Sequence, residues 1–383
     1  MLFRSLAAFA GAVNASALDF DDGHYRGGAI HPSSVIVSSL LVAQQDVDGV
    51  DWQRFCVAQV VGYEIALRAA HLLWPKHPLD DYHCTGTAAT LGAAAAIAKL
   101  RGDDADCISR SISIAWAHAP MSTFQLPMVK ESIGWSAASA LGAADLARAG
   151  FMRHAPGRTP TRSPLAETFP PTPFHRHGAL DDPFVASLGS DFETDQIYFK
   201  AYATCRYTHT ALRSLQQLMT AHGFGADEVD RIDVFTPRPS MRLSDPRPSS
   251  LDHAQYSFPF VLASMLCCGA AGAEEICESA LDDPTRLAAA HNVTVRHDAA
   301  LDPTYPARYA TRLVVSTSRG SFEMTRLVAP GDPDEPMAEV ELVAKFATLT
   351  RSVGGGEASS VAEHFTAQDS PDLDALVALV LDH

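Results

Sequence analysis

Positive charge is scarce in this chain. Its 383 residues include 29 lysines and arginines against 45 aspartates and glutamates, which gives a formal net charge of −16 at pH 7. Proteins that bind nucleic acid without sequence preference use basic clusters to neutralise phosphates, so this charge balance argues against such a function. If the ligand is an anion, its cationic site must be a local gathering of the few basic side chains.

A regular cysteine framework and a long apolar run are also missing. The chain has no C-x-x-C pair and no zinc-ligand spacing, and its cysteines are Cys56, Cys84, Cys107, Cys205, Cys267, Cys268 and Cys277. An odd number in a large chain favours a reducing compartment, so we expect structural thiols in a cytoplasmic protein. Without a run of about 18 apolar residues, no membrane span is expected.

The composition indicates a globular protein, and the N-terminus allows one alternative. The chain is 47% hydrophobic and 19% charged, which suits one large or two medium domains with an ample core. Arg4, a short apolar stretch and Ala15-Ser16-Ala17 resemble a secretory signal. Cleavage there would make Leu18 the new terminus and disrupt the segment described next.

The segment 17–33, ALDFDDGHYRGGAIHPS, is the densest group of candidate catalytic side chains. It contains Asp19, Asp21, Asp22, His24 and His31 around a flexible glycine pair. The closing His-Pro-Ser is typical of a helix start, with Pro32 early in the helix and Ser33 or Ser34 as the cap. A loop that delivers aspartate and histidine to a helix N-terminus suits proton transfer. The alternative is a surface turn with solvated acids.

The first half of the chain predicts a helical bundle. Apolar residues at helical spacing and flanking Pro, Gly and Asp signals predict helices over 33–45, 51–73, 85–101, 104–118 and 131–149. The alanine-rich stretch 85–101 indicates that neighbouring helices approach closely. Residues 154–182 are rich in Pro, Thr and His and predict a surface excursion with solvated histidines.

The second half changes character. Alternating patterns predict strands at 229–236 and 292–296 and a hairpin of 312–318 with 321–327, while helices are expected at 207–222, 257–268 and 271–281. Residues 330–336, PGDPDEP, are expected to be a linker before helices at 337–351 and 372–381. The fold class predicted is therefore mainly α with an inserted α+β lid. Its domains are 1–199 (helical), 200–335 (lid) and 336–383 (helices returning to the first domain).

Four polar clusters stand at element boundaries: 19–31, 80–83, Lys130, and 200–209. The last, KAYATCRYTH, is the densest cationic group in the chain. Lysine, arginine and histidine together suit a di- or tricarboxylate, because charge-assisted hydrogen bonds contribute about 1.5–3 kcal/mol each. A nearby aspartate or histidine can then move a proton beside a carboxylate. Separate structural roles for these clusters are the alternative.

A set of motifs in order along the chain resembles the MmgE/PrpD family. The motifs are ALDFDD with His31-Pro-Ser, Gly62-Tyr-Glu, His83-Cys-Thr-Gly-Thr, Met128-Val-Lys-Glu-Ser-Ile-Gly, Lys200-Ala-Tyr, Cys205-Arg-Tyr-Thr-His and Ser257-Phe-Pro-Phe. That family includes 2-methylcitrate dehydratase, cis-aconitate decarboxylase and iminodisuccinate epimerase. The resemblance implies an all-helical large domain with an α+β lid, usually a homodimer, and chemistry without metal or organic cofactor. The absence of iron–sulfur cysteine spacing agrees.

The resemblance also implies roles for individual residues. Asp19 and His31 match the family's catalytic loop and His83 its second active-site histidine, so we expect Asp19 to orient or tune one histidine. Lys130 and Lys200 match its substrate-binding lysines, and Arg206 and His209 line the site through the CRYTH motif. The function expected is dehydration of a citrate-like polycarboxylate, with no partner beyond this small substrate and a second copy of the chain.

Some positions depart from the family pattern. Ser16 replaces a common histidine, Gly23 replaces a common threonine, and Phe260 replaces the tyrosine of the decarboxylase lid. Phe260 cannot donate a hydrogen bond, which argues against cis-aconitate decarboxylation. The family's first helices are expected to be missing, because the chain starts almost at the catalytic loop. Epimerisation or isomerisation, decarboxylation of a related acid, and a shortened non-catalytic protein are the alternatives.

Overall fold

The computed structural model describes residues 2–25, 30–73, 82–123, 128–152, 182–350 and 372–373. Its chain divides into two compact units. The helical unit comprises Met1–Ala17, Asp21–Ile197 and Ala338–His383, and the α/β unit comprises Leu18–Phe20 and Tyr198–Met337. Residues 153–181 and 374–381, which cover most of the predicted surface excursion and of the last predicted helix, lie outside the described residues.

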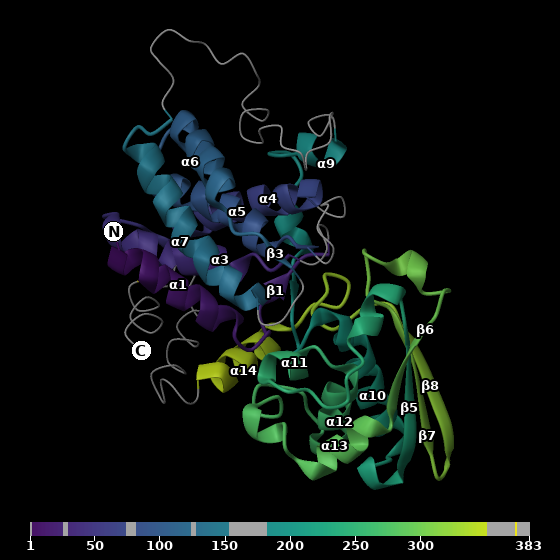
Figure 1. Cartoon of the computed structure of the whole chain (residues 1–383). Coiled ribbons are helices and arrows are strands. Elements are labelled where there is room, and N and C mark those ends of the chain that lie inside the picture. Colours follow the sequence, from purple (N-terminus) through teal and green to yellow (C-terminus); the bar gives the residue numbers. More distant parts are fainter. Residues whose placement is uncertain are drawn as a thin grey trace. The chain divides into compact units, whose positions relative to one another are not determined.

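The helical unit is built around one buried helix. Its helices are α1 (Leu2–Ser16), α3 (Ser33–Ala43), α4 (Trp52–Leu73), α5 (Thr85–Leu100), α6 (Ala105–His118), α7 (Met128–Arg148), the short α9 (Pro183–Ala186) and α14 (Glu339–Thr350). Within α5 every residue except Lys99 is buried, and α3, α4, α6 and α7 pack around it (Figure 1). The helices predicted from periodicity are confirmed to within a few residues, including the Asp104 cap of α6, which accepts the N–H of Cys107.

Small residues let α4 and α5 touch through their backbones. A Cβ atom added to Gly92 would overlap the carbonyl oxygen of Gly62 and lie 2.7 Å from the Cβ of Ala66. Gly62 is equally confined, because its added Cβ would lie 2.9 Å from the Cβ of Ala96. The closeness expected from the alanine-rich sequence is therefore real, and it depends on two facing glycines.

Replacing Gly92 with alanine is expected to lower the free energy of unfolding by about 1–3 kcal/mol, because the methyl group would force the two helices apart. Gly142→Ala in α7 is the matched control: its added Cβ meets nothing within 4 Å, so the better helix propensity of alanine should raise stability by about 0.5–1 kcal/mol. Urea unfolding of both variants measures this. Equal shifts of the same sign would show that contact with Gly62 is unimportant.

The N-terminal residues that resemble a signal sequence form a packed helix. Ala8 and Ala12 of α1 are fully buried, and the ring of Phe9 lies 5.1 Å from the Trp135 ring of α7 in an edge-on arrangement. An added Cβ at Gly134 would lie 2.7 Å from the Phe9 ring. In this structure α1 is therefore part of the core of the helical unit.

Helix α4 alone is long and apolar enough, among the described residues, to cross a membrane by length and composition. However, 61% of its most apolar window is buried inside the protein, chiefly against α5. Its apolar character is therefore explained by its position in the helical core.

The α/β unit contains a mixed sheet covered by helices on one face (Figure 1). The strands run in the order β6 (Val293–His297), β5 (Val229–Thr236), β7 (Thr311–Thr317) and β8 (Gly320–Arg326). β5 pairs with β6 in parallel and with β7 antiparallel, and β7–β8 is the predicted hairpin. Alternate residues of β7, including Leu313 and Val315, are buried. The covering helices are α10 (His209–His222), α11 (Leu251–Gln255), α12 (Phe258–Cys268) and α13 (Pro284–His291).

One predicted helix, residues 271–281, is wrong. Apart from the 3-10 turn Glu278–Ala280, this stretch is irregular, and the α-helix begins later, at Pro284. Asp283 supplies the reason: its carboxylate accepts the N–H groups of Thr285 and Arg286, and the fixed φ of Pro284 suits the first helical position. Local capping chemistry thus outweighed apolar composition.

Candidate functional site

Two predicted catalytic histidines, His31 and His83, lie side by side in the helical unit. Their rings are stacked in parallel, with centroids 5.9 Å apart and planes 4° apart. Each precedes a helix: His31 stands just before α3, and His83 lies in the short strand β2 (Tyr82–His83), which leads into α5 and pairs with β3 (Ser122–Thr123). The His31 N–H donates to the Thr85 hydroxyl at the start of α5 (3.1 Å), so packing of α3 on α5 brings the two imidazoles together.

The tautomer of His31 follows from its neighbours. Its Nδ1 lies 2.7 Å from the main-chain carbonyl oxygen of Asp22, and a carbonyl can only accept, so Nδ1 carries the hydrogen. In the neutral ring, Nε2 is then the basic atom. The Asp21 carboxylate lies 3.5 Å from the same Nδ1 and would stabilise the imidazolium formed when Nε2 takes a proton. His31 is therefore arranged as a base at Nε2.

Asp22 holds this arrangement in place. Its buried carboxylate accepts the hydroxyl of Tyr63 (2.7 Å) and the N–H of Ser33 (3.1 Å). The sequence predicts Ser33 or Ser34 as the cap of α3. In the structure the Asp22 carboxylate accepts the first N–H of the helix instead, where the helix dipole favours negative charge. Burial, and then the charge of Asp21, raise the pKa of the Asp22 carboxyl, while the Ser33 and Tyr63 hydrogen bonds oppose the shift. Burial, and then the charge of Asp22, raise the pKa of the Tyr63 hydroxyl well above its usual range.

The other predicted catalytic residue, Asp19, lies in the α/β unit. It accepts a 2.8 Å hydrogen bond from the ammonium group of Lys200, and both residues are buried. Asp19 has a left-handed backbone with φ of +48°, which is uncommon outside glycine and marks a constrained position. Cys205 lies close by: burial, and then the charge of Asp19, raise the pKa of its thiol to about 12, so this cysteine is a poor nucleophile. The carboxylate beside His31 is thus that of Asp21, and the Asp19 carboxylate accepts from Lys200.

Arg206 and His209, predicted to line the substrate site, make their described contacts inside the α/β unit. The Arg206 guanidinium forms an ion pair with Asp332 and donates to the carbonyl of Pro330 (2.9 Å). It also lies 3.1 Å from Nδ1 of His209. Lys130 falls in the first turn of α7, and its side chain lies outside the described residues.

A buried ion pair not foreseen from the sequence lies in the middle of α4. Arg68 is fully buried, and its guanidinium pairs with the Glu64 carboxylate one turn earlier. The opposite oxygen of Glu64 accepts the N–H and hydroxyl of Thr194 at 2.8 and 2.6 Å. Arg68 also donates to the Ser187 hydroxyl and the Asp191 carbonyl at 3.2 and 3.1 Å. This pair therefore fastens residues 187–194 to α4.

Glu193, the residue before Thr194, contacts the segment 17–33. The Glu193 carboxylate lies 3.3 Å from Nε2 of the buried His24. The main-chain N–H of His24 donates to the carbonyl of Ile30 (2.9 Å), directly before His31. Glu64 belongs to the Gly62-Tyr-Glu motif noted in the sequence. The motif does not show that Glu64 binds Thr194, which lies more than a hundred residues away.

None of the seven cysteines, each within the described part of the chain, forms a disulfide bond. Cys84, beside His83, is buried, and burial raises the pKa of its thiol to about 12. Neither Cys84 nor Cys205 is therefore suited to nucleophilic catalysis. The expected structural role of these two thiols is consistent with their burial.

Comparisons with known proteins agree on one family. The MmgE/PrpD N-terminal domain matches residues 2–157, and the MmgE/PrpD C-terminal domain matches residues 202–368. Cis-aconitate decarboxylase of Aspergillus terreus (strain NIH 2624 / FGSC A1156) is 24% identical over 373 residues, which cover 91% of this chain and 74% of that protein. A second Aspergillus terreus cis-aconitate decarboxylase is 23% identical over the same shares. Both halves of the sequence and the order of its motifs point the same way, and the chain belongs to the MmgE/PrpD family.

Proposed function

We propose that this chain is a cofactor-independent lyase that acts on a small polycarboxylate by removing a proton next to a carboxylate. Dehydration of a citrate-like hydroxy acid, such as 2-methylcitrate, is the reaction we favour. The observation that carries the proposal is the stacked pair of His31 and His83, in which His31 has its Nδ1–H held by a carbonyl. Family membership supports lyase chemistry in general.

The proposed steps follow from the two imidazoles. Nε2 of His31 takes the hydrogen from the carbon next to a carboxylate, and Asp21 stabilises the resulting imidazolium. The electrons of that C–H bond form the C=C bond as the neighbouring C–O bond breaks. His83 donates the proton that lets the hydroxyl leave as water. Simultaneous positive charge on two imidazoles 5.9 Å apart is unfavourable, so arrival of the substrate proton on His31 assists the loss of a different proton from His83 to the leaving hydroxyl.

Lys200 is the proposed partner of a substrate carboxylate. Removing a proton next to a carboxylate builds negative charge on its oxygens, and a fixed ammonium group in a buried position stabilises that charge. Lys200 is fully buried and anchored by Asp19, so it needs little reorganisation during the reaction. Lys130 is proposed as a second carboxylate ligand on the basis of its motif. These side chains supply acid, base and charge stabilisation, so the proposed reaction needs no metal or organic cofactor.

A second candidate is decarboxylation of cis-aconitate, which the two Aspergillus terreus relatives favour by name. Against it stands Phe260 at the start of α12. This ring is fully buried and carries no hydroxyl, whereas the resemblance leads us to expect a tyrosine in a decarboxylase. Epimerisation remains the third candidate, because it uses the same proton removal without loss of a leaving group.

A panel assay distinguishes these reactions. The purified full chain is incubated in D2O with citrate, 2-methylcitrate, cis-aconitate and simple hydroxy dicarboxylates. A dehydratase should produce an alkene absorbance, a decarboxylase should release CO2, and an epimerase should incorporate deuterium with neither signal. No turnover of any acid by protein shown to be folded would contradict the proposal and favour a non-catalytic role.

We also propose that the α/β unit is the lid of the family fold, inserted into the helical domain, and that the working form is a homodimer. The chain supports the first point by its order alone, because it leaves the helical unit at Ile197 and returns to it at Ala338.

A further inference from the structure

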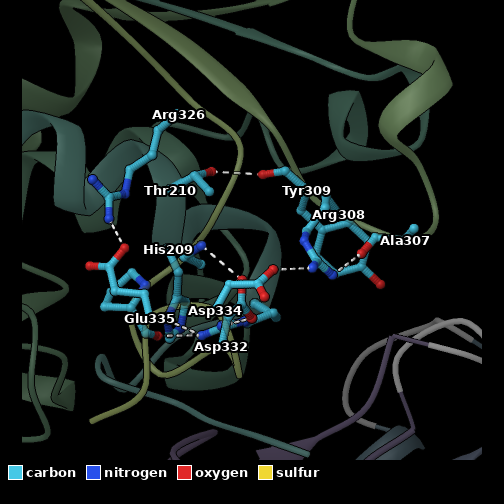
Figure 2. A network of polar contacts seen from close by, with 12 residues as sticks. His209, Thr210, Ala307, Arg308, Tyr309, Arg326, Asp332, Asp334 and Glu335 are labelled. Carbon is cyan, nitrogen blue, oxygen red and sulfur yellow. Dashed lines mark hydrogen bonds and ion pairs between the residues drawn. The ribbon is translucent and has the colours of Figure 1, made fainter. Parts of the chain in front are cut away.

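The acidic segment 330–335, which forms most of the expected linker 330–336, is held in place by arginines (Figure 2). Its residues Pro330, Gly331 and Asp332 are buried, and Asp332 is fully so. Arg206 pairs with Asp332, Arg308 with Asp334, and Arg326 with Glu335. A flexible connection would not bury a carboxylate, so this segment has a structural task.

Arg206 is the centre of that attachment. Beyond the Asp332 ion pair and the bond to the Pro330 carbonyl, its guanidinium lies over the ring of Tyr198, 4.2 Å from the centroid. The second oxygen of Asp332 accepts the N–H of Ala329 at 2.9 Å. Arg206 thus ties the turn 329–332 to Tyr198, two residues before Lys200.

His209 completes the attachment in its neutral form. A guanidinium only donates hydrogen bonds, so Nδ1 of His209, 3.1 Å from Arg206, must accept. Its Nε2 then donates to the carbonyl of Thr204 at 3.1 Å. Both ring nitrogens are engaged in holding Arg206 and the Thr204 backbone, which leaves the ring poorly suited to proton transfer.

The turn 329–332 contacts Phe199, the residue before Lys200. The N–H of Phe199 donates to the carbonyl of Gly331 at 3.0 Å. Gly331 has φ of +87°, and an added Cβ would overlap the carbonyl oxygen of Phe199 and lie 2.9 Å from its carbonyl carbon. Only glycine fits this approach, so the backbone at Phe199 is held by the turn itself.

We propose that Arg206, His209 and Asp332 are positioning residues rather than substrate ligands: they clamp the turn 329–332 against Tyr198 and Phe199, and so fix the backbone from which Lys200 reaches Asp19. The proposal rests on the assigned role of Lys200 in the proposed function. It reassigns the CRYTH motif from binding substrate carboxylates to holding the backbone segment that carries the lysine.

The test combines activity with local hydrogen exchange. Arg206→Met and Asp332→Asn are made singly, together, and each in a Lys200→Met background. The clamp predicts that both single variants lower kcat/KM by about 10–100-fold, that the double variant is no worse, and that neither adds a loss once Lys200 is gone. Amide exchange in a peptide spanning 197–201 should accelerate in both. Arg308→Met, which breaks an exposed ion pair of the same segment, should change neither measurement.

A substrate-binding Arg206 predicts a different pattern, which would overturn the proposal. Arg206→Met would then raise KM additively with Lys200→Met, while Asp332→Asn would leave KM and exchange at 197–201 unchanged. If Arg206→Met does not fold, the isosteric Asp332→Asn and the charge-preserving Arg206→Lys decide the question. Exchange needs no substrate: if wild-type protein turns over no polycarboxylate, the proposed function fails, and unchanged exchange in Asp332→Asn would separately refute the clamp.

Discussion

His31→Ala is expected to lower kcat by about 10²–10⁴-fold, the usual contribution of a positioned general base. The physical reason is the fixed tautomer: the Asp22 carbonyl holds the Nδ1 hydrogen at 2.7 Å, so Nε2 of His31 is the basic atom. Asp21→Asn should cost less, about tenfold, because it removes the carboxylate that stabilises the imidazolium but leaves the base in place. Steady-state kinetics on the substrate found in the panel assay measures both effects.

Two controls separate proton transfer from damage to the fold. His118→Ala removes an exposed histidine at the end of α6 and should leave kcat unchanged. Added imidazole should restore part of the activity of His31→Ala, because a free base can occupy the space left by the ring. Wild-type kcat in a folded His31→Ala variant would remove His31 from the mechanism.

Arg68→Met is expected to reduce the free energy of unfolding by about 3–5 kcal/mol, because it leaves the Glu64 carboxylate buried without its cation. The side chains of Arg68 and Glu64 are 0% and 4% exposed, so water cannot replace the lost partner. The variant would also release Ser187 and Asp191, which Arg68 holds through hydrogen bonds. Chemical unfolding followed by circular dichroism measures the loss.

The double variant Glu64→Gln/Arg68→Met tests the stated cause. Glutamine keeps an acceptor for Thr194 and removes the stranded charge, so the double variant should be more stable than Arg68→Met alone. Arg148→Ala is the comparison for an exposed ion pair: the Arg148 side chain is 57% exposed, 3.6 Å from Asp103, and its loss should cost less than about 1 kcal/mol. A double variant less stable than Arg68→Met would show that charge burial is not the dominant cost.

The helical unit was the easier part to predict because its signals are local. Apolar spacing, a proline after α4 and the Asp104 cap lie within a few residues of the helices they define, and the structure confirms those helices. The stretch 271–281 does not form the predicted helix, because the Asp283-Pro284 start signal that follows it places the helix later. The sequence of residues 330–332 predicts part of a linker, because Pro, Gly and Asp are also common in exposed loops. In the structure these residues form a buried turn.

The charged contacts of the candidate site could not be predicted from local sequence patterns. The motifs assign His31 and His83 to the proposed site, and in the structure their rings are stacked with centroids 5.9 Å apart. The partner of each charged group was not anticipated: Asp19 pairs with Lys200 at a separation of 181 residues, and Arg206 with Asp332 at 126. Asp19, Asp21 and Asp22 have the same chemistry and nearly the same position in the sequence, so spacing could not tell which one meets an imidazole and which an ammonium group.

By itself, then, the amino-acid sequence determined most of the helices and strands and the titratable residues proposed to move a proton, because caps, periodicity and titratable groups are local properties. Only the tertiary structure decided the protonated nitrogen of His31, the acid that faces it, and the engagement of Arg206 with Asp332. Each of these depends on how the backbone brings separated residues into contact, nine positions apart for His31 and Asp22 and 126 apart for Arg206 and Asp332. That outcome is set by how the helices and the sheet pack, and by which buried charge finds a partner there.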